Sequence, residues 1–152
     1  GFKPGVYIIK DGELKSDLGG IVGGNGVTLI FTGTASRMNF DKSTVLSFKA
    51  PETGPYAGIL LYQDPNSPTT ETFEISSKTA SILLGTIYLP NGIFKVHAQN
   101  KVGDKSAYTV ILARKIDIGA NADLVINADY GSTKVPVPAG LGPQSGTIRL
   151  VE

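Results

Sequence analysis

The sequence predicts an all-β fold, a right-handed parallel β-helix (β-solenoid) of about five coils with three short strands per coil. Apolar, β-branched segments recur about every 21–32 residues, at 5–9, 26–31, 58–62, 85–89 and 108–112. Such spacing is typical of proteins that stack one supersecondary unit on the next. Each interval also holds further strand-like pieces in the same order, separated by Gly, Asn, Asp and Pro.

The further pieces fill a second and a third place in each coil. Second-place strands are expected at 13–16, 37–40, 72–76, 93–97 and 116–118, and third-place strands at 20–22, 44–48, 81–84 and 124–127. In the fourth coil, the third piece is missing or distorted around 99–106.

The second-place strands alternate between apolar and polar residues, which predicts one buried face and one solvated face. The predicted interior residues are Met38, Phe40, Phe73, Ile75, Ile116 and Ile118, and the outward ones include Arg37, Asn39, Glu74, Lys95 and Asp117. First-place strands are apolar almost throughout, as in 58–61 and 110–113. These predict burial on both faces, with a loop, a partner or another domain over that side.

Length and composition indicate one β-solenoid domain over 1–152, with a Pro/Gly-rich C-terminal cap or tail at 134–152. The 14 Lys and Arg nearly balance the 13 Asp and Glu, so neither nucleic acid nor an anionic membrane surface is an expected partner. The chain has no Cys, which excludes disulfides and thiol chemistry, and no apolar run of transmembrane length.

No catalytic, cofactor or metal site is predicted. The single histidine, His97, falls on the polar side with Lys95, where a surface residue is the usual interpretation. Asp64 precedes a proline and is expected to begin a turn.

One acidic cluster leaves an enzymatic alternative open. Asp117, Asp123 and Asp129, with Arg114 and Lys115, supply the residue types of a carbohydrate-active β-helix enzyme. The competing interpretation is a solvated corner, because solenoid turns need Asp, Asn and Gly for their own geometry.

Two other features have structural and functional interpretations. The glycine-rich stretch 18–26 lacks the Lys-Ser or Lys-Thr of a phosphate loop and precedes a strand, so its Gly and Asn are expected at positive φ in a turn. Tyrosines in strands usually form core or cross-coil stacks, although exposed ones also form glycan or protein platforms. These tyrosines are Tyr7, Tyr56, Tyr62, Tyr88, Tyr108 and Tyr130.

Four segments carry a family resemblance: 54–65 (GPYAGILLYQDP), 84–91 (LGTIYLPN), 110–127 (VILARKIDIGANADLVIN) and 148–151 (IRLV). They resemble the C-terminal region of TadE/TadG-like proteins of bacterial tight-adherence (Flp-type) pilus assembly. The resemblance implies an N-terminal membrane helix upstream, with the β-rich region displayed on the periplasmic or extracellular side. It supplies no catalytic residues.

The expected function is therefore a non-enzymatic structural or binding module of the bacterial cell envelope, in pilus assembly or adhesion. Envelope or pilus proteins are the expected partners, with glycan as a further candidate, and membrane contact only through the upstream anchor. The alternatives are a carbohydrate-active enzyme or glycan-binding protein on a β-helix, and a bactofilin-like polymer. The Pro-rich 135–138 is expected to cap the C-terminal end, because Pro cannot donate to a strand ladder.

Overall fold

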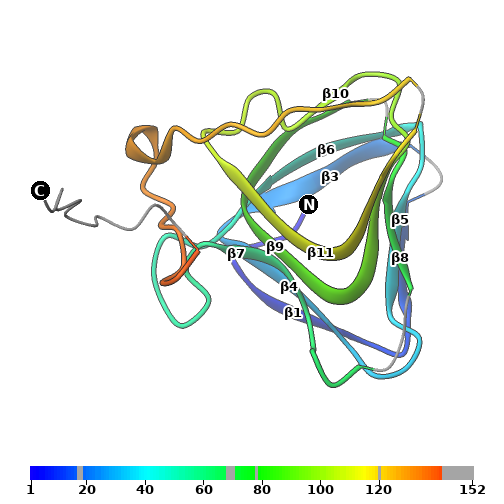
Figure 1. Ribbon diagram of the computed structural model, residues 1–152, viewed down its shortest axis with the longest axis horizontal. Coiled ribbons are helices and arrows are strands. Elements are labelled where there is room, and N and C mark those ends of the chain that lie inside the picture. Colours follow the sequence, from blue (N-terminus) through cyan, green and yellow to red (C-terminus); the bar gives the residue numbers. More distant parts are fainter. Residues whose placement is uncertain (17–18, 68–70, 78, 120, 142–152) are drawn as a thin grey trace, which may run out of the picture.

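The computed structural model describes residues 1–16, 19–67, 71–77, 79–119 and 121–141. It is all-β, a parallel β-solenoid of about five coils, which confirms the predicted fold class. Figure 1 looks along the stack, so the coils overlap and their three sides appear in outline.

The first side is a parallel ladder of the recurring apolar segments. Its strands are β1 (Gly5–Lys10), β4 (Val27–Thr32), β7 (Ile59–Gln63), the middle of β9 (Thr79–Val96) and the first half of β11 (Thr109–Ile118). Each strand pairs with the equivalent strand of the next coil, as the sequence spacing predicts.

The second side continues the same pattern around a corner. It contains β2 (Glu13–Ser16), β5 (Arg37–Phe40), β8 (Thr72–Ile75) and the last parts of β9 and β11. The third side contains β3 (Gly20–Asn25), β6 (Thr44–Lys49), the start of β9, β10 (Lys101–Val102) and β12 (Asp123–Leu124). The third piece of the fourth coil is thus present as the two-residue β10, and a short 3₁₀ helix, η1 (Tyr130–Ser132), follows the last coil.

The interior is built from columns of apolar side chains in register. Met38, Phe40, Phe73 and Ile75 are each at most 2% exposed, as predicted. Ile116 and Ile118 were also expected inside, but they are 42% and 48% exposed. Their alternation is correct, since they pair with the buried Phe94 and Val96, but they belong to the last coil and the described residues place no further coil over them.

The outer surface of the first side is partly covered by the chain itself. In Figure 1 the 51–58 loop and the described part of the C-terminal tail lie at the left, at the corner where the third side meets the start of the first side. A Cβ on Gly58 would lie 2.0 Å from the backbone oxygen of Pro136, so the tail contacts the backbone directly before β7. The segment 58–61 is largely buried as predicted, whereas 110–113 is only half-buried.

The tail reaches the first side through Tyr108. This fully buried residue donates a hydrogen bond from its hydroxyl to the Pro136 carbonyl over 2.5 Å, and Val135 beside it is 4% exposed. The described tail, 134–141, therefore runs along the side of the stack, while 142–152 lies outside the described residues. The cap over the C-terminal end, expected from 134–152, stays a prediction.

The glycine-rich stretch differs from its prediction in part. Gly19, Gly20 and Gly26 have positive φ, but Gly23 and Gly24 lie within β3, as does Asn25. A Cβ on Gly23 would lie 2.0 Å from the Ser47 carbonyl oxygen, so this glycine allows close approach between stacked coils. Along the described parts of the chain, no helix is long and apolar enough to cross a membrane.

Candidate functional site

The outer surface of the second side carries charges that pair from coil to coil. Lys95 Nζ lies 3.1 Å from Glu74 Oε2, and these two residues are in register on adjacent strands. Burial opposes the ionisation of Glu74, but hydrogen bonding by Ser76 and Lys95 outweighs it and lowers the pKa of this carboxyl. Such half-exposed pairs each contribute at most about 1 kcal/mol.

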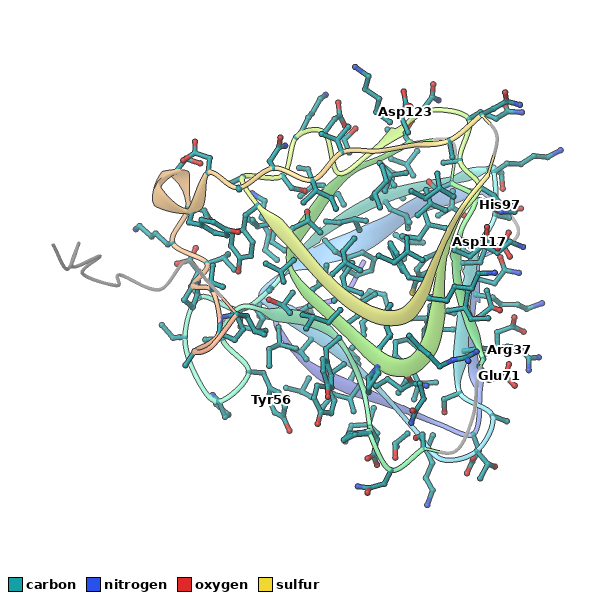
Figure 2. All side chains as sticks on the ribbon, in the orientation of Figure 1. Arg37, Tyr56, Glu71, His97, Asp117 and Asp123 are labelled. Atoms are coloured by element: carbon teal, nitrogen blue, oxygen red, sulfur yellow. The ribbon has the colours of Figure 1, made fainter. Side chains whose placement is uncertain are left out.

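A second group of charges lies where the strands of the same surface begin. Arg37 Nε is 3.3 Å from Glu13 Oε1, and its Nη1 is 3.8 Å from Glu71 Oε2. Figure 2 shows Arg37 and Glu71 side by side on this surface. Sequence reasoning placed Arg37 and Glu74 outside but did not pair them, because the pairing depends on the register between coils.

His97 acquires a carboxylate partner that the sequence spacing did not indicate. Its Nε2 lies 4.0 Å from Asp117 Oδ1, and Lys115 Nζ lies 3.9 Å from Asp117 Oδ2. His97 is on the polar surface with Lys95, as predicted, and its side chain is 38% exposed. A shallow pocket of about 260 Å³ beside it is lined by His97, Gln99, Gly119, Asn121 and Ala122.

The acidic residues proposed for an enzymatic group lie on different elements. Asp117 is on β11, Asp123 is on β12 of the third side, and Asp129 precedes η1. Figure 2 shows Asp117 next to His97 and Asp123 apart from both. Arg114 is exposed at the corner of β11. In the described ranges, no group of three or more His, Asp or Glu side chains could hold a metal ion.

Asp64 begins a turn as predicted. Its side chain accepts hydrogen bonds from the backbone N–H of Asn66 and from the hydroxyl of Thr32, and both donor–acceptor distances are 2.9 Å. The pKa of Asp64 is lowered, mainly by the hydrogen bond from Asn66 and secondly by the hydrogen bond from Thr32. The carboxylate therefore stabilises the turn in its ionised form.

The first side carries the most distinctive outward surface, which we call the tyrosine surface: Ile59, Tyr62, Thr86, Tyr88 and Leu141. Tyr62 and Tyr88 stack across adjacent coils with ring centroids 5.4 Å apart and planes 26° apart. The cavity at this surface has a volume of about 290 Å³. The Thr86 hydroxyl is buried there and has no hydrogen-bond partner in the described part of the chain.

The other tyrosines divide between packing and surface positions. Tyr108 packs against Tyr130 at 5.3 Å, and burial, followed by the charge of Tyr130, raises the pKa of Tyr108 to about 12. Tyr7 makes an edge contact with Phe2. Tyr56 lies at the lower left in Figure 2, where it lines a cavity of about 450 Å³ with Pro4, Val6, Pro51 and Pro55 among others.

Comparison with protein-family models, curated proteins and solved structures found no match to this chain.

Proposed function

We propose that this chain is a non-enzymatic structural or binding module of the bacterial cell envelope, acting in pilus assembly or adhesion. The observation that carries the proposal is the tyrosine surface, which lies on a continuous parallel ladder. Stacked strands hold such a surface rigidly, so little conformational entropy is lost when a partner binds.

The composition of the tyrosine surface favours a protein partner. Tyr62 and Tyr88 present large amphipathic side chains, and the buried Thr86 hydroxyl lacks a partner among the described residues. Tyrosines are enriched in protein interfaces relative to the rest of the protein surface. A sugar would need a free ring face for stacking, and one face of Tyr62 and one face of Tyr88 are occupied by their contact with each other.

The enzymatic alternative receives less support from the geometry. It requires Asp117, Asp123 and Arg114 to line one groove, but these residues lie on separate sides or corners of the solenoid. The resemblance to TadE/TadG-like proteins adds weight to the envelope and to pilus or envelope proteins as partners.

Location is the first test. Source cells are fractionated, and protease is added to intact cells and to spheroplasts. We expect the native protein in the membrane fraction, with this region cleaved from the outer side. Soluble cytosolic protein that resists external protease would refute the envelope assignment.

Binding through the tyrosine surface is tested with single cysteines, since the chain has none. Tyr62→Cys places a thiol on this surface in a middle coil, and Lys42→Cys places one at an exposed corner as the matched control. Both should react with a maleimide in the purified protein. In intact spheroplasts, we expect protection at position 62 and labelling at position 42; equal labelling would show that nothing covers the tyrosine surface.

A further inference from the structure

Among the described residues, the two ends of the solenoid present strand edges with no further strand paired to them. In the described chain, β1 pairs only with β4, β2 only with β5, and β11 only with β9. Ile116 and Ile118 are half-exposed on the β11 edge, although they face the interior. An exposed edge of this kind is a template for another strand.

The first coil carries the side chains that would continue the columns of the last one. Leu14 begins a column that runs through Met38, Phe73 and Phe94 to Ile116. A copy stacked on β11 in the same register would place its Leu14 on Ile116. On the first side, its Tyr7 would meet Ile111, so apolar residues would meet apolar residues on both sides.

The outward charges match in the same register. Glu13 stands at the start of the column that ends at Lys115, and Lys15 stands at the start of the column that ends at Asp117. Stacking one copy on another would therefore place Glu13 over Lys115 and Lys15 over Asp117. Opposite charges would meet at both positions, which favours this register over a slipped one.

The corner between the first two sides is also compatible with stacking. The number of residues between Tyr7 and Leu14 in the first coil equals the number between Ile87 and Phe94 in the fourth coil. The fourth coil already packs against β11 with this spacing. The first coil of another copy can thus follow both halves of β11.

We infer that this chain stacks head to tail with second copies of itself, with β1 and β2 of one copy pairing in parallel with β11 of the next. The contact joins two different surfaces, so repeating it extends the stack as an open filament. This inference does not rest on the proposed function, because it requires neither a particular compartment nor another partner.

The segment 1–4 limits the strength of this contact. Phe2 N–H donates to the Gly23 carbonyl over 2.8 Å, and its ring packs against Tyr7 and Phe48. In a stack, this segment would lie at the level where 125–129 of the next copy, the one that supplies β11, lies beside 102–107. One of the two segments must move, so we expect weak association of the whole chain and tighter association when 1–4 is removed.

A charge exchange tests the register. Glu13→Lys alone, and Lys115→Glu alone, place like charges at the contact, whereas an equimolar mixture of the two variants restores opposite charges. By sedimentation velocity over a concentration series, each variant should associate roughly tenfold more weakly than the parent, and the mixture should recover parental association. Arg37 keeps Glu71 as a partner in Glu13→Lys, and circular dichroism checks that both variants fold.

Cross-linking tests the same contact without relying on affinity. Strands paired in register bring equivalent positions within disulfide range. A chain carrying both Glu13→Cys and Lys115→Cys should form a ladder of covalent multimers on mild oxidation, and one carrying Lys42→Cys and Lys115→Cys should not. A chain that stays monomeric at about 1 mM, both whole and without 1–4, overturns the inference, as does association that the charge variants leave unchanged.

Discussion

Truncation of Phe73 is a direct test of the interior register. Its ring is fully buried, contacts Phe31 edge-on with centroids 5.0 Å apart, and lies in a column between Met38 and Phe94. Phe73→Ala should lower the free energy of unfolding by roughly 3–5 kcal/mol, because it removes apolar contacts and leaves a cavity. The lost ring pair, worth about 0.5–1.5 kcal/mol, favours the upper half of that range.

Ile116 supplies the matched control, because it belongs to the same column but is 42% exposed. Ile116→Ala should lower the free energy of unfolding by only about 1 kcal/mol, since solvent already reaches the side chain. Urea unfolding followed by circular dichroism measures both, and with a slope of about 2 kcal/mol per molar urea the Phe73 midpoint should fall by about 2 M. A loss below about 1 kcal/mol for Phe73→Ala would show that the strand faces are reversed.

Three further predictions concern charge and the tail. The pKa of Glu74 is lowered on folding, so the stability that this carboxylate contributes is present above its unfolded pKa and is lost as pH falls through its folded pKa. Glu74→Gln should therefore reduce the loss of stability in acid. Urea unfolding at pH 7 and below about pH 4 measures the difference. The pKa of Tyr108 is raised to about 12, so the stability of the fold should decrease as pH rises from about 10 to 12. In a titration of tyrosine absorbance at 295 nm, Tyr108→Phe should remove the ionisation step near pH 12. Gly58→Ala should displace Pro136 and speed hydrogen exchange in 133–141, whereas Gly54→Ala, also at positive φ but with nothing within 4 Å, should leave the tail in place.

The fold could be predicted because its two strongest signals are local. Strand segments at 5–9 and 26–31 share composition and spacing, and they became the paired β1 and β4. Alternation in 37–40 and 72–76 assigned Met38 and Phe73 to the interior without any tertiary information. A period of two determines the face of every residue in a strand once one of them is assigned.

Features that depend on position in the stack could not be predicted in the same way. Ile116 has the same local pattern as Phe73, yet it is exposed because it lies in the last coil. The sequence around Gly23 predicts a turn, but the structure places this residue in a strand, where the close approach of the Ser47 backbone from the next coil requires a glycine. Neither the number of coils above a residue nor the separation between two backbones is encoded in a short window of sequence.

The charged surface of the second side shows what register adds to alternation. Alternation alone assigns Glu74, Lys95 and Asp117 to the outside and leaves them as separate solvated charges. Once the strands are aligned, these three occupy one column, and their signs alternate from coil to coil. Like charges directly opposite on neighbouring strands are destabilising, so such a column favours one register over its neighbours. Charges that look ordinary in the sequence thus help to keep the coils aligned, and Lys15 and Asp117, which stand at the two ends of that column, extend the same preference to the ends of the stack.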